Sequence, residues 1–82
     1  MDRPEWWNWE IEISSHCTKR MRERVFSEAD LRAILADATD PIEQIHGTFL
    51  CKSRHENQDW EVIVVPDIEK RLIVVVTAYL VG

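Results

Sequence analysis

Hydrophobic and charged residues alternate near the start of the chain. Trp9, Ile11 and Ile13 are separated by Glu10 and Glu12, and a period of two is typical of a strand with one buried face. We therefore expect a short strand ahead of the first helix.

A tryptophan-rich arm, residues 1–9, precedes and overlaps this strand. Three of its last four positions, 6, 7 and 9, are tryptophan. These rings are predicted either to cover an apolar surface of their own domain or to bind a partner or a second copy, because exposed aromatic clusters mark interfaces.

Residues 14–40 have the pattern of two helices. Ser14 and Ser15 are candidate caps for a helix over about His16–Arg24. A second helix is predicted from Ser27, which forms a capping-box pattern with Asp30, to about Ala38. Its apolar face follows the i, i+3, i+4, i+7 spacing, with the members Leu31, Ile34, Leu35 and Ala38.

The remaining residues have the pattern of an antiparallel sheet. A turn at His46-Gly47 and a polar hairpin loop over 55–59 separate the apolar segments. The predicted strands cover 42–45, 48–54, 60–65 and 72–81. Residues 10–82 are therefore expected to form a single α+β domain, with two N-terminal helices packed on an antiparallel sheet of about four strands.

Length and charge narrow the function. The chain has 82 residues and a net charge of −5, which excludes a multidomain enzyme with a large cofactor site and disfavours a wholly basic nucleic-acid binder. Two cysteines, no signal-peptide pattern and a longest apolar run of about ten residues indicate a soluble, cytoplasmic protein with reduced thiols and no membrane segment.

Metal and cofactor motifs are missing. There is no glycine-rich phosphate loop, no nucleophile elbow and no acidic metal cluster. The spacings of the three histidines and two cysteines match no zinc-site pattern. We expect no metal and no cofactor.

A basic stripe lies on the first predicted helix. His16, Arg20 and Arg24 are spaced i, i+4, i+8, and Lys19 lies beside them. Arginine holds phosphate bidentately and histidine transfers protons near neutral pH. The stripe is either a phosphodiester-binding site or a solvated charged surface.

Polar residues on two strands extend this hypothesis. Lys52 and Arg54 are expected on one face of their strand and would add phosphate contacts. Thr77 and Tyr79 are expected on the face that carries Ile73 and Val75. These two hydroxyls either make ordinary cross-strand hydrogen bonds or project towards the cleft of His16.

The order of these motifs resembles the DUF4258 family of small bacterial domains. The resemblance covers about residues 12–80 and rests on His16-x-x-x-Arg20-Met21-x-Glu23-Arg24, Ser27-Glu28-x-Asp30-Leu31, Trp60–Val64 and the ending Leu72–Tyr79. It implies a fold similar to the barnase–EndoU–colicin–RelE class of small ribonuclease toxins. By this resemblance His16, Arg24, Thr77 and Tyr79 match the catalytic positions.

The sequence is compatible with two functions. The first is a metal-independent endoribonuclease of the toxin type or a relative of one, with RNA and an antitoxin or immunity protein as partners. His16 would transfer protons, and phosphate would be bound by Lys19, Arg20, Lys52 and Arg54. The second is a non-catalytic protein-binding or homodimerising module that keeps the fold without the chemistry. The apolar last strand and the tryptophans are expected either to cover one another or to make a homodimer, and a homodimer is the favoured partner arrangement.

Overall fold

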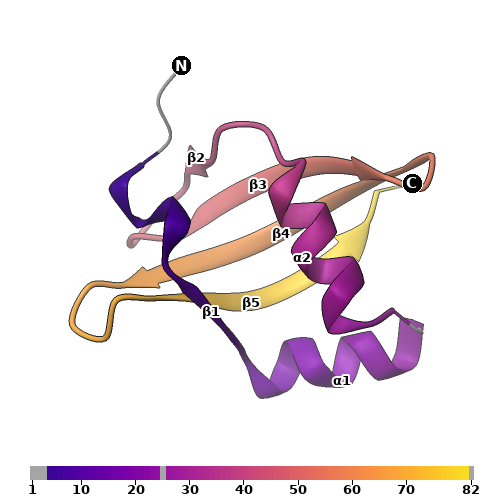
Figure 1. Cartoon of the computed structure of the whole chain (residues 1–82), viewed down its shortest axis with the longest axis horizontal. Helices are drawn as coiled ribbons and strands as arrows, with labels where there is room; N and C mark the ends of the chain where they lie inside the picture. Colours follow the sequence, from indigo (N-terminus) through magenta and orange to yellow (C-terminus); the bar gives the residue numbers. More distant parts are fainter. Residues whose placement is uncertain (1–3, 25, 82) are drawn as a thin grey trace.

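Two helices pack on a five-stranded sheet in the computed structural model, which describes residues 4–24 and 26–81 (Figure 1). The predicted α+β class is therefore confirmed. The elements in chain order are the 3₁₀ turn η1 (Glu5–Asn8), β1 (Glu10–Ile13), α1 (Ser15–Arg24), α2 (Glu28–Ala36), β2 (Ile42–Glu43), β3 (Phe49–His55), β4 (Gln58–Asp67) and β5 (Leu72–Leu80).

The first and last strands of the chain are neighbours in the sheet. Its strand order is β1-β5-β4-β3-β2, and β2 to β5 form the expected antiparallel meander. The short strand β1 adds to the edge of β5 in parallel, with Ile11 beside Ile73. The sheet thus has five strands where about four were predicted.

Ser14 fixes the junction between β1 and α1. Its Oγ accepts a hydrogen bond from the backbone N–H of Cys17 at 3.0 Å, which caps the helix, and donates one of 2.8 Å to the carbonyl of Val76. The backbone N–H of Ser14 also donates to the carbonyl of Val75 at 3.1 Å. One residue therefore starts α1 and ties it to β5.

The capping box predicted for α2 is present. Ser27 Oγ accepts from the backbone N–H of Asp30 at 3.1 Å, and the Asp30 carboxylate accepts from the backbone N–H of Ser27 at 2.9 Å. Leu31, Ile34 and Leu35 are buried as expected. The helix ends at Ala36, two residues earlier than predicted.

The core lies between the helices and one face of the sheet. Cys17 of α1, Leu31 of α2 and Val62 of β4 are each fully buried there. Neither cysteine forms a disulfide. No helix among the described residues is long and apolar enough to cross a membrane.

The first tryptophan belongs to this core. Trp6 in η1 is 8% exposed, and its ring lies 4.9 Å from the ring of Phe49 in β3. Trp7 and Trp9 pack against the core from its rim. Residues 1–3 of the predicted arm lie outside the described residues. The boundary of the arm at residue 9 stays a prediction.

The β3–β4 hairpin is tighter than its sequence suggested. Glu56 and Asn57 have φ of 51° and 65°, as in a two-residue type I′ turn, which suits the right-handed twist of the strands. His55 and Gln58 therefore pair as strand residues. The expectation of a polar loop over 55–59 is wrong, because strand pairing continues through polar residues up to the turn.

Strand β4 likewise extends past its predicted end at Val65. Pro66 pairs with Ile73 of β5, although proline lacks the N–H that a central strand needs. The pairing of β3 with β4 ends at Val64, so Pro66 has a strand neighbour on one side only, where proline is tolerated.

Candidate functional site

The residues predicted to form the site are distributed over three places. His16, Lys19, Arg20 and Glu23 line one hollow, formed by a single face of α1. His16 is exposed there. The predicted neighbourhood of His16, Lys19 and Arg20 is thus present, but Glu23 adds a negative charge to it.

Arg24 lines a different hollow. Each i+4 step on a helix advances about 40° around the axis, so a residue eight positions on is displaced by roughly 80°. Arg24 accordingly borders the ends of β3, β4 and β5, in a hollow that includes His55, Trp60 and Leu80. The i, i+8 spacing does not keep His16 and Arg24 in one hollow.

Thr77 and Tyr79 lie on the sheet face opposite to the one expected for them. Ile63 pairs with Thr77 but the next residue, Val64, pairs with Val75, so Val76 is an extra residue that forms a β-bulge. A bulge reverses the alternation of side chains beyond it. Ile73 and Val75 face the core, whereas Thr77 and Tyr79 face away from the helices.

The hydroxyl of Tyr79 is engaged on that face. It donates a 2.7 Å hydrogen bond to Oε1 of Glu61, the residue opposite it on β4. This hydrogen bond, followed by desolvation and by the charge of Glu61, raises the pKa of Tyr79. Of the two alternatives expected for Tyr79, the structure shows the cross-strand hydrogen bond.

Lys52 and Arg54 lie on the same outer face. Their neighbours Cys51 and Ser53 are buried on the core side, as alternation along β3 requires. Nη1 of Arg54 is 2.9 Å from Oδ1 of Asp59, and Lys52 pairs in register with Glu61. Acidic residues on β4 therefore stand beside both of these cations.

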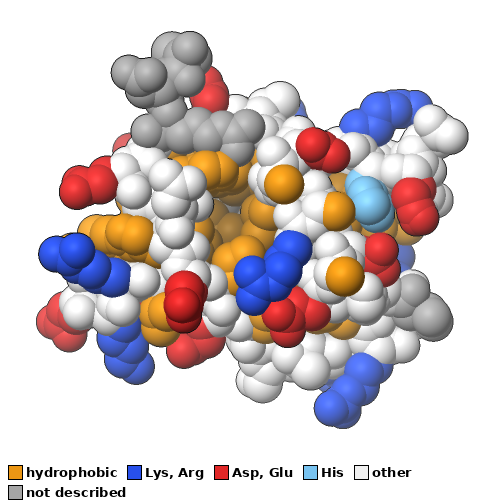
Figure 2. All heavy atoms as spheres, viewed as in Figure 1, with side chains coloured by type: hydrophobic (Ala, Val, Ile, Leu, Met, Phe, Trp, Pro, Cys, Tyr) orange, Lys and Arg blue, Asp and Glu red, His pale blue; other side chains and the backbone are white. Residues whose placement is uncertain are grey.

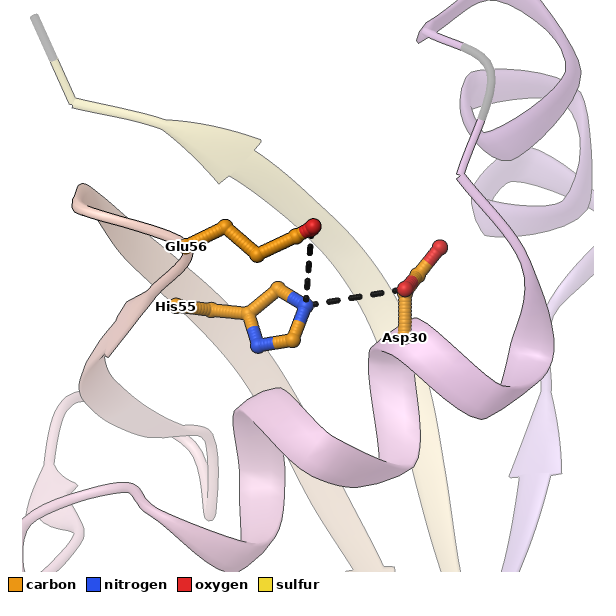
Figure 3. A group of neighbouring side chains, drawn as sticks. All are labelled: Asp30, His55 and Glu56. Carbon is orange, nitrogen blue, oxygen red and sulfur yellow. Dashed lines mark ion pairs between the residues drawn. The ribbon is translucent and has the colours of Figure 1, made fainter.

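A histidine–carboxylate cluster that sequence reasoning missed lies at the other side of the sheet (Figure 3). Nε2 of His55, the last residue of β3, is 3.5 Å from Oδ1 of Asp30 on α2 and 3.8 Å from Oε2 of Glu56 in the turn. The His55 side chain is 19% exposed. Its Nε2 atom is buried and has no hydrogen-bond partner among the described residues.

Local structure positions each member of this cluster. His55 follows Cys51 and Ser53 on the core side of β3, so it points towards α2. The capping box holds Asp30, and the hydrogen bonds from Ser27, followed by smaller contributions from His55, lower the pKa of Asp30. Glu56 has the left-handed backbone of the turn, a conformation that is costly for a residue other than glycine.

The cluster borders a small hollow with two aromatic walls. The rings of Phe26 and Trp60 meet edge to face there, 4.9 Å apart, and Nε1 of Trp60 is buried without a hydrogen-bond partner among the described residues. The volume of this hollow is about 150 Å³. The lining residues are Arg24, Phe26, Asp30, His55, Glu56, Gln58, Trp60 and Leu80.

The donor set also raises the question of a metal. Asp30, His55 and Glu56 each offer one ligand atom, all within 4.8 Å of one another. Arg24 lines the same hollow, however, and its permanent positive charge opposes a bound cation. The arrangement of one imidazole, two carboxylates and one guanidinium is better suited to proton transfer and anion binding.

A second hollow, between the N-terminal segment and α2, is apolar (Figure 2). Trp7, Ile11, Leu35 and Ile73 line it together with Arg32. Arg32 is the one titratable group among the described residues that line it.

Comparison with known proteins identifies a family. Residues 13–80 match the family model described as "Domain of unknown function (DUF4258)", in agreement with the resemblance expected for about residues 12–80. No curated protein and no solved structure matches the chain.

Proposed function

The chain belongs to the DUF4258 family, and from the side chains that its fold brings together we propose a metal-independent endoribonuclease of the toxin type, or a relative of one. The observation that carries this proposal is the His55 imidazole held between two carboxylates in a hollow that also contains Arg24. The proton-transfer residue is thus His55 and not His16.

Each group in the hollow has a role in cleaving RNA. Arg24 binds the nonbridging oxygens of the scissile phosphate. Glu56 takes the proton of the ribose 2′-hydroxyl as O2′ bonds to phosphorus, and protonated His55 gives its proton to O5′ as the P–O5′ bond breaks. The products are a 2′,3′-cyclic phosphate and a free 5′-hydroxyl.

The remaining groups position these reactants. Asp30 orients the imidazole, while the rings of Phe26 and Trp60 offer faces and edges for a base next to the scissile bond. The 3.8 Å contact between His55 and Glu56 must open for a phosphate to enter. Glu56 is the partner that moves, because its side chain is 68% exposed at the tip of the hairpin.

The test is hydrolysis of a fluorogenic RNA by the purified protein, with and without EDTA. His55→Ala is expected to lower the rate by about 10²–10⁴-fold, the usual contribution of one acid–base group. His46→Ala, a matched change in an exposed turn, should keep the wild-type rate, and EDTA should have no effect.

His16→Ala separates this site from the basic hollow on α1. Loss of cleavage in His16→Ala with full cleavage in His55→Ala would place the chemistry on α1 instead. Absence of wild-type cleavage above an RNase-free control would refute the ribonuclease function.

The second function, a non-catalytic binding module, is supported by a different observation. The helices cover one face of the sheet only, and the other face carries partly exposed apolar residues across its central strands. The net charge of −5 also favours a protein partner over a polyanion. A chain that binds a protein partner and cleaves no RNA would have this function.

A further inference from the structure

The sheet face away from the helices has a continuous apolar centre. Leu50, Ile63 and Thr77 lie side by side on β3, β4 and β5, and Val65 lies beside Val74 in the next row. All five are partly exposed. Ile42, which pairs with Leu50 on β2, is 46% exposed and extends this patch to the sheet edge.

Opposite charges occupy opposite corners of the same face. Glu10 and Glu12 are exposed on β1, where they pair with the beginning of β5. Lys52 is exposed on β3, level with Glu61 and hence with Tyr79 near the end of β5. In the chain segments 4–24 and 26–81 neither Glu12 nor Lys52 has an ion-pair partner within 4 Å.

We propose that this face binds a second copy of the chain about a two-fold axis, with Glu12 of each copy beside Lys52 of the other. A two-fold axis within the interface plane can superpose the acidic corner of one copy on the basic corner of the other. Because these corners are diagonal, the strands of the two sheets then cross at a steep angle, which is the orthogonal class of sheet packing.

The self-complementary charge identifies the occupant. An isologous interface needs each surface patch to match itself after rotation. On this face Glu12 and Lys52 lie at opposite corners of an apolar centre without ion-pair partners among the described residues, whereas Arg54 is paired with Asp59, and Glu61, beside Lys52, accepts the hydrogen bond of Tyr79. Its plan area is on the order of 600 Å² from ordinary strand dimensions. This approaches the roughly 800 Å² per partner of a standard interface.

The inference is independent of RNA cleavage, and a charge-swap experiment tests it. Glu12→Lys places two lysines together at each corner contact, and Lys52→Glu places two carboxylates together. Each variant alone should dimerise more weakly than the wild type by on the order of tenfold or more.

An equimolar mixture of the two variants should recover dimers. In the heterodimer the lysine introduced at position 12 of one copy meets the glutamate introduced at position 52 of the other. At the second corner contact the native Lys52 of the first copy meets the native Glu12 of the second. Both contacts then join opposite charges, so the repulsion present in each homodimer is absent.

Light scattering across a concentration series, with one variant carrying a mass tag, reports both results. Glu28→Lys on α2 makes the same charge change on the helix side and should leave dimerisation unchanged. Circular dichroism checks that each variant is folded.

Three outcomes would overturn the proposal. They are a wild type that stays monomeric throughout the series, single variants that dimerise as the wild type does, and a mixture no more dimeric than its components. A monomer whose open face binds an unrelated protein also overturns it, since the occupant would then be a different chain.

Discussion

Tyr79 and Glu61 face each other across β5 and β4, joined by a 2.7 Å hydrogen bond from the phenol to the carboxylate. The bulge at Val76 creates this pair by turning Tyr79 away from the core. Since the hydrogen bond favours the protonated phenol, it raises the pKa of Tyr79. The contribution of this hydrogen bond to stability is therefore complete below the ordinary tyrosine pKa. It is lost as the pH rises through the higher pKa that Tyr79 has in the folded protein.

Removing the Glu61 side chain should lower the pKa of Tyr79 towards its ordinary value. Tyr79 is the sole tyrosine of the chain, so the ultraviolet absorbance of tyrosinate measures it directly. The pKa of Tyr79 is expected to be highest in the wild type and lowest in Glu61→Ala. Glu61→Gln, which keeps an acceptor but no charge, should lie between them. Glu12→Gln is the control on the same face, and equal values for Glu61→Ala and wild type would contradict the prediction.

The capping box should make stability depend on acid pH. Hydrogen bonds from Ser27 lower the pKa of Asp30 in the folded protein. The contribution of Asp30 to stability is therefore present above the pKa it has in the unfolded chain, and it is lost as the pH falls through its lower folded pKa. Asp30→Ala should show a flatter fall in unfolding free energy between mildly acidic and strongly acidic pH, measured by urea unfolding. A fall as steep as that of the wild type would contradict this assignment.

At neutral pH, Ser27→Ala is expected to cost about 0.5–2 kcal/mol, measured by urea unfolding. Thr39→Ala, a change of another exposed hydroxyl residue, provides a comparison outside the helix cap. An unchanged midpoint for Ser27→Ala would show that the cap contributes nothing to the folded state.

The buried apolar face of α2 should contribute more to stability than its exposed ion pair. Leu35 is 7% exposed, and its truncation to alanine is expected to cost roughly 2–5 kcal/mol. Arg32→Ala removes an exposed ion pair with Glu28, which is worth about 0.3–0.5 kcal/mol. Urea midpoints should therefore separate the two variants clearly, and a similar small shift for both would contradict the burial of this face.

Trp6 and Trp7 of η1 should differ in their contribution to stability. Trp6 is in the core, so Trp6→Ala is expected to cost about 3–5 kcal/mol, whereas Trp7→Ala, at the partly exposed rim, should cost less. Glu5→Ala in the same turn is the exposed control. Thermal unfolding of the three variants measures the loss of stability in each. Equal losses for Trp6→Ala and Trp7→Ala would contradict the placement of Trp6 in the core.

Local patterns in the sequence predicted local structure well. The periodicity of Leu31, Ile34 and Leu35 and the capping box of Ser27 involve residues within one or two helical turns, so the segment itself contains all the interacting partners. The short strand before α1 was predicted for the same reason. Its parallel pairing with β5 depends on residues about 60 positions away, and no pattern within Glu10–Ile13 specifies it.

The candidate site depended on features that a single segment does not reveal. The bulge at Val76 lies where the register with β4 shifts, and the Val76 carbonyl accepts a hydrogen bond from the distant Ser14. Neither partner is visible within β5, so alternation along this strand alone placed Thr77 and Tyr79 on the wrong face. His55 was assigned to a loop because its neighbours are polar. Alternation from Cys51 through Ser53, together with a two-residue turn at Glu56-Asn57, would have directed it towards α2.

The hydrogen bond from Ser14 to Val76 also limits when the fold can be completed on the ribosome. The two residues are 62 positions apart, and β1 can enter the sheet only after β5 has been synthesised. The apolar side of β1 therefore stays unpaired while the helices and the central hairpin, including the Phe49 ring that contacts Trp6, are already available to fold. Contacts of such long sequence separation slow folding, and until β5 is complete the open edge of the sheet and the apolar side of β1 are exposed to aggregation.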